Sequence, residues 1–260
     1  MTERADQTVP HFAALADAGW PALSRVAAGG WEARFAGGVT KRANSAWRPA
    51  GAAALSQALS AEAVAAVERA YQERGLPPVF QLAGSDEEAE RRLVARGYRP
   101  VDETVVLAAS VTRDLAGLAG DDVIVAAEPG REWLDCWWAV DGRGGEAELE
   151  IARRIMLGTP ALYAALRVEG AVAAVARLAL VGSWGGLYCV ATLPEHRRRG
   201  YGARAVAALL AAGAERGVTD AWLQVLARNE GALALYSRFG FREVDRYRYL
   251  VGDVAAVALS

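Results

Sequence analysis

The amino-acid sequence predicts a mixed α/β protein built from two copies of one helix–strand–helix–strand unit. Two internal alignments indicate the duplication. Residues 63–75 match residues 205–217 at eight of thirteen positions. After a shift of one residue, residues 81–102 align without a gap to residues 224–245, with Gln, Glu, Ala, Gly, Arg, Val and Asp at matching places. Abundant alanine inflates the first match but not the second, so the repeat favours a tandem architecture.

The first half of the chain shows alternating helix and strand patterns. Residues 11–28 look helical, and the turn Gly19-Trp20-Pro21 divides them into two pieces. Glycines at positions 75 and 97 close the next two helices. The other expected elements are a strand over 31–40 interrupted at Gly37-Gly38, a polar loop over 41–49, a helix over 61–74, a strand over 79–82, a helix over 86–96 and a strand over 101–109.

The second half begins after a segment typical of a linker, residues 112–121, which contains Gly117 and Gly120. We therefore place an N-terminal domain at residues 1–115 and a C-terminal domain at residues 122–260. The expected strands are 123–127, 161–168, 172–181, 187–192, 222–226 and 241–251, and the expected helices are 131–140, 146–156, 202–216 and 229–239.

Composition excludes several classes of function. The formal net charge of -2 disfavours nucleic acid as the main partner. No apolar run reaches the ~20 residues of a membrane span, and the N-terminal residues lack the apolar core of a signal peptide. Two distant cysteines and two histidines make a disulfide framework, a zinc site or a histidine-based triad hard to build. We expect a cytoplasmic protein with no metal and no membrane partner.

The most informative stretch is residues 187–203, where an apolar run ends at Pro194 and an Ala-rich helix pattern follows. Between them lie Arg197, Arg198 and Arg199 and the step Gly200-Tyr201-Gly202. Glycine allows close approach of a ligand to the backbone, a helix start offers unpaired N–H groups, and arginine adds charge-assisted hydrogen bonds. The pattern therefore suits a pyrophosphate, although a solvated basic loop with flexible glycines would have the same sequence pattern.

The same residues also fit the Gly-x-Gly-x-x-Ala fingerprint of dinucleotide-binding folds, with Asp220 about twenty residues further on. Two features disfavour that interpretation. Five residues separate Pro194 from Gly200, whereas the first glycine of the fingerprint follows its strand almost directly. The acidic residue should end the next strand, but Asp220 precedes it. A nicotinamide dehydrogenase is therefore the weaker interpretation.

A second motif lies downstream, where Asn229 is suited to cap a helix that ends at Gly240. Tyr236 shares one face of this helix with Leu235 and Phe239. As an isolated tyrosine it would be a core aromatic residue. Its phenol would alternatively serve as a proton donor near the strand ends.

Together the two motifs resemble the GCN5-related N-acetyltransferase (GNAT) family over about residues 122–252. The resemblance implies two tandem three-layer domains, each with a mixed, mostly antiparallel sheet flanked by helices, and an acetyl-CoA-dependent acyl transfer. It implies that Tyr236 protonates the departing thiolate. It further implies the following residues for acetyl-CoA binding: Val190, Ala191 and Thr192 beside the pantetheine arm, Arg197, Arg198, Arg199, Gly200, Tyr201, Gly202 and Ala203 around the pyrophosphate, and Asn229 close by.

The chemistry of this transfer needs no enzyme nucleophile, because a neutral amine attacks a thioester directly. The expected acceptor is a primary amine of a small molecule or a protein. The strand over 187–193 carries no carboxylate to act as general base, and Glu195, Asp135 and Glu148, acting through water, are weak candidates. That missing carboxylate keeps open an alternative function, a non-catalytic acyl-CoA-binding regulatory protein.

The first copy resembles a degenerate repeat. Leu93 stands where the second copy has Tyr236, Asp86 stands at the place of Asn229, and residues 55–60 contain neither Gly-x-Gly nor arginine. We therefore expect no acetyl-CoA in this half and a structural or acceptor-shaping role. A polar cluster would either face the substrate cleft or satisfy its local backbone; it comprises Lys41, Arg42, Asn44 and Ser45.

Overall fold

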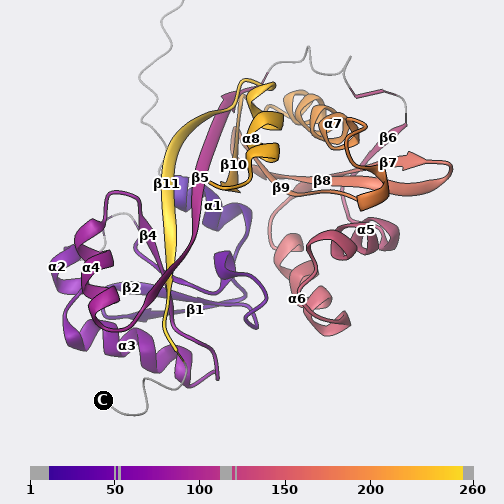
Figure 1. The fold of residues 1–260 in the computed structure, drawn as a ribbon. Coiled ribbons are helices and arrows are strands. Elements are labelled where there is room, and N and C mark those ends of the chain that lie inside the picture. Colours follow the sequence, from indigo (N-terminus) through magenta and orange to yellow (C-terminus); the bar gives the residue numbers. More distant parts are fainter. Residues whose placement is uncertain (1–11, 50, 52–53, 112–118, 121, 254–260) are drawn as a thin grey trace, which may run out of the picture.

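A computed structural model describes residues 12–49, 51, 54–111, 119–120 and 122–253. It shows two lobes joined by two long strands (Figure 1). The expected linker at 112–121 lies outside the described residues except for positions 119 and 120, as does the proposed domain boundary near 115. The division into two domains therefore stays a prediction.

The first half supplies most of one lobe. Its helices are α1 (Phe12–Gly19), α2 (Leu55–Ala58), α3 (Ala61–Gln72) and α4 (Glu87–Ala95), with a short 3₁₀ turn η1 (Lys41–Ala43). Its strands are β1 (Ser24–Ala28), β2 (Trp31–Phe35), β3 (Ala46–Trp47), β4 (Val79–Ala83) and β5 (Arg99–Ser110).

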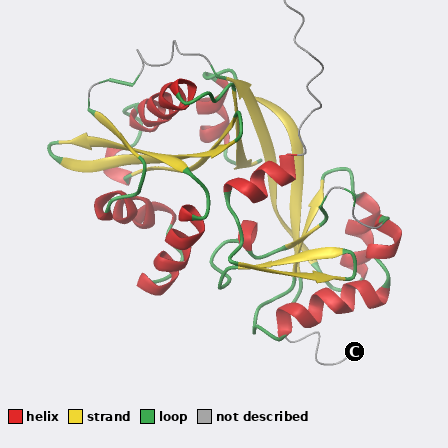
Figure 2. Cartoon of the chain, turned by 180° about the vertical axis from the view of Figure 1, so that it is seen from behind, coloured by secondary structure: helices red, strands yellow, loops and turns green. Residues whose placement is uncertain are grey.

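The second half supplies most of the other lobe, and Figure 2 shows helices packed around the strands in both lobes. Its helices are α5 (Arg131–Asp141), α6 (Glu146–Leu157), α7 (Tyr201–Glu215) and α8 (Glu230–Ser237), with a 3₁₀ turn η3 (Pro194–His196). Its strands are β6 (Val123–Ala126), β7 (Ala161–Val168), β8 (Ala171–Val181), β9 (Trp184–Thr192), β10 (Asp220–Leu226) and β11 (Arg242–Val251).

Most expected elements are present with shifts of a few residues, but the second piece of the 11–28 helix is wrong. Residues Ser24–Ala28 form β1, which pairs antiparallel with β2. Alanine and valine fit either element, and the pairing with β2 decides between them. The expected strand over 31–40 ends at Phe35, and the polar loop over 41–49 contains η1 and β3.

One sheet runs through both lobes of the described chain in the order β1-β2-β3-β4-β11-β5-β10-β9-β8-β7-β6. The pairs β3–β4 and β9–β10 are parallel, and the other neighbouring pairs are antiparallel. The expectation of a mixed, mostly antiparallel sheet flanked by helices is confirmed. Two separate sheets are not present: β5 of the first half enters the second lobe beside β10, and β11 of the second half enters the first lobe beside β4.

The exchange of β5 and β11 follows the sequence repeat. Gln81 of β4 faces Tyr249 of β11. The repeat relates positions 143 residues apart, so Gln81 corresponds to Gln224 and Tyr249 corresponds to Val106. These two counterparts also face each other, across β10 and β5. All five pairs between β4 and β11 have such counterparts between β10 and β5. In the central pair of strands, β5 and β11, Tyr247 faces Thr104, and the repeat makes these two residues counterparts of each other. This residue pair therefore marks the pseudo-twofold axis.

Helices cover both faces of the sheet in the second lobe. One face of β8 carries Ala176 and Leu178, which pack with Val206 and Leu209 of α7. The opposite face packs against α5 and α6, in a core that also contains Phe12 and Trp20 from the beginning of the chain. Residues next to each other in a strand point to opposite faces, so a single strand serves both layers. The second lobe is therefore a three-layer structure, and α1 belongs to its core.

Candidate functional site

The sheet opens between β9 and β10. Their parallel pairing runs from Trp184–Asp220 to Leu187–Leu223 and stops there. Beyond this point β9 contains a bulge opposite β8, where Cys189 has a φ of +53°. The bulge bends the strand and leaves the β10-facing edge of residues 190–192 without a strand partner in the described chain. An extended ligand can add to such an edge through backbone hydrogen bonds.

A pocket of about 580 Å³ lies at the end of this opening, between the loop after β9 and helix α8. We call it the loop pocket. Gly200, with a φ of +80°, precedes α7, and no side chain caps the first turn of that helix. Backbone N–H groups at the helix start are therefore free for a ligand. The residues that line this pocket are Val190, Thr192, His196, Arg197, Arg198, Gly200, Tyr201, Gly202, Ala203, Gly231, Ala232, Ala234, Leu235, Tyr236 and Arg238.

Three of the sequence-predicted binding residues do not line the loop pocket. Ala191 is buried in the core on the α5 side of the sheet, so only its backbone reaches the β9 edge. Arg199 is exposed and lies outside the pocket lining. Asn229 caps α8, where its Oδ1 accepts a hydrogen bond from the Ala232 N–H at 3.1 Å. Its side chain lines a different cleft.

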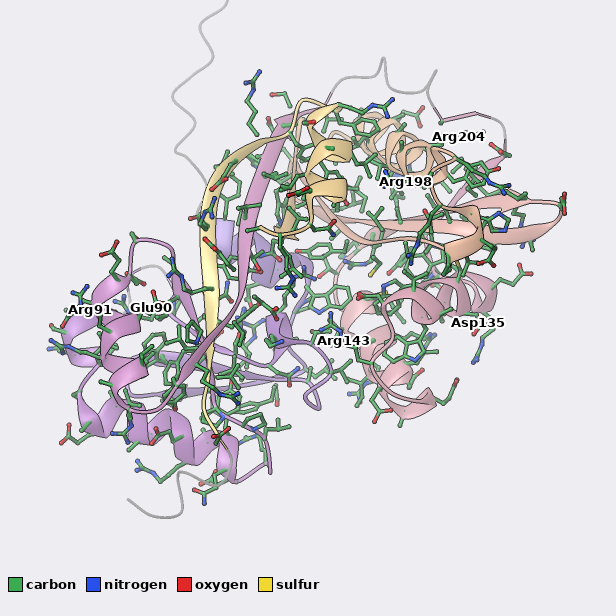
Figure 3. All side chains as sticks on the ribbon, viewed as in Figure 1. Glu90, Arg91, Asp135, Arg143, Arg198 and Arg204 are labelled. Atoms are coloured by element: carbon green, nitrogen blue, oxygen red, sulfur yellow. The ribbon has the colours of Figure 1, made fainter. Side chains whose placement is uncertain are left out.

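This second cleft, of about 460 Å³, lies between the two lobes, and we call it the central cleft. Residues of η1, β5, α5, β9, β10, α8 and β11 form its walls, and Arg143 lies beside the gap between the lobes (Figure 3). It shares Val190, Ala232 and Tyr236 with the loop pocket. The two cavities therefore meet at these residues, and Tyr236 lines both of them.

Tyr236 is buried in the core and also lines both cavities. It is 7% exposed and its ring packs edge-on against Phe241 at 5.9 Å. Its hydroxyl makes no hydrogen bond within the described chain. Burial raises the pKa of Tyr236 to about 12, against the opposing charge of Arg42. The phenol is therefore neutral at physiological pH and holds a proton that it can donate.

The charged residues of the central cleft form two groups that the sequence motifs did not reveal. Lys41 donates to Asp102 at 2.8 Å, and Arg228 lies 3.6 Å from the same carboxylate. The hydrogen bond from Lys41, more than any other cause, lowers the pKa of Asp102. Asp141, at the end of α5, pairs with Arg143 at 3.5 Å. Two carboxylates thus lie in the cleft, contributed by segments far apart in sequence.

The polar cluster at 41–45 divides between the cleft and the interior. Lys41 and Arg42 line the central cleft. Asn44 is buried, and its Oδ1 accepts hydrogen bonds from the N–H groups of Ala36 and Gly38 at 2.7 and 2.8 Å. Ser45 is buried as well and accepts a hydrogen bond from Arg34. The two inner residues hold the turn that carries the two cleft residues.

None of the three weak candidates for a general base lines either cavity. Asp135 pairs with Arg131 on the outer side of α5 (Figure 3). Glu148 accepts a hydrogen bond from the Gly145 N–H and so caps α6. Glu195 lies in η3, outside the lining of the central cleft and of the loop pocket. The carboxylates that do line the central cleft are Asp102 and Asp141.

The two thiols are poor nucleophiles. Burial raises the pKa of Cys189 to about 12 and that of Cys136 to about 11, so both are neutral. In the described part of the chain, no three His, Cys, Asp or Glu residues gather as a metal-binding group. No helix within the described ranges has both the length and the apolar character to cross a bilayer.

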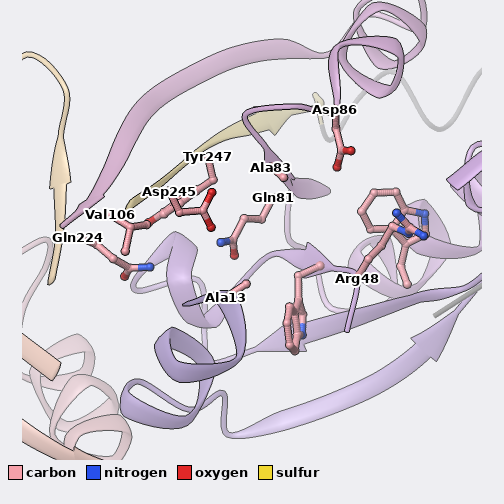
Figure 4. Close-up of a pocket in the computed structure, with 11 residues that line it drawn as sticks. Ala13, Arg48, Gln81, Ala83, Asp86, Val106, Gln224, Asp245 and Tyr247 are labelled. Carbon is pink, nitrogen blue, oxygen red and sulfur yellow. The ribbon is translucent and has the colours of Figure 1, made fainter. Parts of the chain in front are cut away.

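A smaller cavity of about 240 Å³ lies on the other side of the pseudo-twofold axis (Figure 4), and we call it the Asp86 cavity. Six of its lining residues have repeat counterparts that line the central cleft. These residues are Gln81, Ala83, Asp86, Val106, Asp245 and Tyr247, and their counterparts are Gln224, Leu226, Asn229, Tyr249, Asp102 and Thr104.

The loop pocket also has a counterpart in the first lobe. A cavity of about 380 Å³, the Leu93 pocket, lies between the start of α3 and the end of α4. Its lining residues are Leu59, Ala61, Val64, Arg92, Leu93, Ala95 and Arg96. Ala61 corresponds to Ala203, and Leu93 corresponds to Tyr236. The Asp86 cavity and the Leu93 pocket therefore correspond, by the sequence repeat, to the central cleft and the loop pocket.

Comparison with known proteins gives a family match over almost the whole chain. A family profile described as "Probable histone acetyltransferase Rv0428c C-terminal" matches residues 9–250. The chain is 27% identical over 244 residues to the uncharacterized N-acetyltransferase YobR of Bacillus subtilis, covering 91% of this chain and 96% of that protein. It is 36% identical over 78 residues to the [ribosomal protein bS18]-alanine N-acetyltransferase of Escherichia coli, which is 53% of that protein.

Solved structures show the same fold. A GCN5-related N-acetyltransferase from Kribbella flavida has a TM-score of 0.64 at 21% identity, with 94% of this chain and 96% of that chain covered. A conserved protein of unknown function from Staphylococcus epidermidis has a TM-score of 0.65 at 11% identity, with 90% and 94% covered. At these identities the likeness concerns the fold.

Proposed function

Because this chain belongs to the Rv0428c C-terminal family of GCN5-related N-acetyltransferases, we propose that it transfers the acetyl group of acetyl-CoA to a primary amine. The enzyme class is that of the family, an acyltransferase. The observation that carries the proposal is the meeting of the loop pocket and the central cleft at Tyr236. One cavity suits the acetyl donor, the other suits the acceptor, and a proton donor lies between them.

The residues of the loop pocket fit acetyl-CoA. The uncapped start of α7 and the arginines before it offer N–H groups to a pyrophosphate. A side chain at position 200 would strain the backbone, because the φ of +80° favours glycine. The free edge of β9 at residues 190–192 would pair with the amides of the pantetheine arm.

Acetyl-CoA supplies an acetyl group activated as a thioester. The backbone N–H groups beside the bulge at Cys189 would orient the carbonyl and stabilise the negative charge that develops on its oxygen. Tyr236 would donate its proton to the sulfur that leaves, since its pKa of about 12 keeps the phenol neutral. Asp102 or Asp141 would accept the proton of the amine through water, because these carboxylates line the central cleft.

We also infer that the first half is a degenerate copy of the second, with a boundary near residues 115–122, and that it shapes the acceptor site. The shared register of the exchanged strands supports the duplication. Lys41 and Arg42 on the wall of the central cleft support the role in acceptor binding. The family description and the bS18 enzyme both name protein acceptors, whereas a cleft of about 460 Å³ also suits a small molecule.

A two-part experiment tests the proposal. Acetyl-CoA should raise the melting temperature of the protein, whereas NADH should not. Release of free CoA should then accelerate with at least one member of a panel of primary amines and amine-bearing peptides. Binding of acetyl-CoA without turnover of any acceptor would contradict the enzymatic function.

A further inference from the structure

Arg42 differs from the other cations of the central cleft, because no carboxylate lies within ion-pair distance of it in the described chain. Lys41 and Arg228 pair with Asp102, and Arg143 pairs with Asp141. Arg42 contacts neutral groups only. Its Nη2 lies 3.5 Å from the Gln224 carbonyl oxygen, and its guanidinium lies 5.9 Å from the centre of the Tyr188 ring.

A second arginine adds to the positive field at the same place. Arg177 is fully buried, and its guanidinium lies 5.5 Å from the centre of the Tyr188 ring that also contacts Arg42. It donates to carbonyl oxygens, among them those of Gly19 and Met156, at 2.9 and 2.8 Å. The guanidinium groups of Arg42 and Arg177 thus both lie near the Tyr188 ring, and neither forms an ion pair with a carboxylate of the described residues. A cleft with unbalanced positive charge attracts an anionic group.

Three residues that line the central cleft each carry a buried hydrogen-bonding atom without a partner among the described residues. The three atoms are Arg42 Nε, Tyr249 Oη and Gln224 Oε1. Buried polar atoms normally find partners, so these unpaired atoms leave hydrogen-bonding capacity in the wall of the cleft. Arg42 and Tyr249 can donate, and Gln224 Oε1 can accept.

The turn that carries Arg42 is held firmly by its neighbours. Lys41 is anchored through its ion pair with Asp102. Thr40 accepts a hydrogen bond from Trp20 Nε1 at 3.0 Å through its hydroxyl, and from Asn44 Nδ2 at 2.7 Å through its carbonyl oxygen. A guanidinium on a rigid turn binds a planar anion at a small cost in conformational entropy. The site is therefore prepared before the ligand arrives.

We propose that the acceptor of this enzyme is a small amine that also carries a carboxylate, as an amino acid does, and that Arg42 binds this carboxylate. The inference rests on the proposed transfer to an amine and adds the class of acceptor. The planar fork of arginine matches a carboxylate, Tyr249 can donate to the same group, and Gln224 Oε1 can accept from the ammonium or amine. The cleft volume of about 460 Å³ suits a small molecule.

The test compares matched pairs of acceptors. CoA release is measured with amino acids and with the corresponding amino acid amides, and kcat/KM is normalised to the concentration of free amine. We expect the acids to be favoured about 10- to 100-fold, as for a charge-assisted hydrogen-bonded pair. Arg42→Met should remove this preference, and Arg42→Lys, which keeps the charge but loses the fork, should restore part of it. Arg228→Gln removes a charge from the same cleft and should keep the preference within about threefold.

Each other outcome has a defined meaning. Equal rates with acids and amides would overturn the carboxylate inference and leave acetyl transfer intact. A stronger preference for O-phosphoethanolamine over the carboxylates would assign Arg42 to a phosphate, and a preference for peptides would exclude a small acceptor. Acetyl-CoA-dependent thermal stabilisation of each variant shows that it folds. If no amine is turned over, the proposed function fails, and binding of N-acetyl amino acids against their amides still tests Arg42.

Discussion

The loop pocket and the Leu93 pocket occupy equivalent places in the two lobes but offer an anion different surroundings. In the first lobe, the hydroxyl of Ser60 accepts a hydrogen bond from the Ala63 N–H at 3.1 Å and so caps α3. In the second lobe, Gly200 takes the position before α7 and supplies no side-chain cap. The Ser60 hydroxyl thus occupies one N–H group of the first turn of α3 that would otherwise be open to a ligand. The start of α3 is therefore partly closed by a side chain of the protein, whereas the start of α7 has no such cap.

A replacement at Gly200 should have the largest effect. Gly200→Val places a branched side chain at a φ of +80° beside the loop pocket, so we expect acetyl-CoA affinity to fall more than 100-fold. Isothermal titration calorimetry measures the loss, together with a wild-type stoichiometry of one per chain. Gly217→Val is the matched control, because Gly217 has a φ of +88° at the other end of α7 and lies outside the pocket. Equal losses in both variants would mean that strain, and not the pocket, is responsible.

Removal of the Tyr236 hydroxyl should come next in size. Tyr236→Phe keeps the ring against Phe241 and removes the proton donor, so kcat should fall about 10- to 100-fold. The dissociation constant for acetyl-CoA should change less than threefold. Leu93→Met alters the equivalent position of the first lobe and should leave kcat unchanged. Full activity of Tyr236→Phe would show that the Tyr236 hydroxyl has no part in the reaction and that the ring serves only in packing.

The two helix starts at Asn229 and Asp86 should differ in stability. Asn229→Ala loses the cap on α8 and should lower the free energy of unfolding by about 1 kcal/mol. Asp86 makes no such side-chain bond to α4, so Asp86→Ala should cost less than about 0.5 kcal/mol. Urea titrations followed by circular dichroism measure both values. A larger loss for Asp86→Ala would show that the first lobe depends on that residue in another way.

The smallest effect concerns pH. A tyrosine with its ordinary pKa of about 10 would be about one quarter protonated at pH 10.5, whereas a pKa of about 12 leaves Tyr236 almost fully protonated. Activity that needs this proton should therefore persist to pH 10.5 and decline only as the pH approaches 12, a difference of about fourfold. A pH profile of kcat at saturating acceptor, with circular dichroism at each pH, checks it. A falling limb centred near pH 10 would show that burial does not protect the phenol.

The local motifs were predictable from the sequence because each uses residues that lie close together in the chain. Gly200 before α7 and Asn229 before α8 follow helix-start rules that need no tertiary information. Residues 24–28 did not follow such a rule. Their alanine and valine suit a helix as well as a strand, and only the pairing with β2 makes them β1.

The central cleft was only partly predictable, since it depends on distant segments. Lys41 and Asp102 are 61 residues apart, and Arg42 lies 182 residues before Gln224. The sequence offers Asp135, Glu148 and Glu195 as weak candidates for a general base. The cleft carboxylates instead lie on β5 and at the end of α5. The exchange of β5 and β11 between the lobes created that cleft wall, and no local pattern predicts which strand joins which lobe.

The position of β11 has a consequence for synthesis of the chain. This strand lies between β4 and β5, yet it follows every other described strand in the sequence. On the ribosome, the first lobe therefore waits for residues 242–251 before its sheet can close, and during that time β4 and β5 each lack a neighbour. Such an interval favours chaperone binding and makes early termination of translation costly. The sheet that unites the two lobes thus ties the folding of the first lobe to the synthesis of residues 242–251.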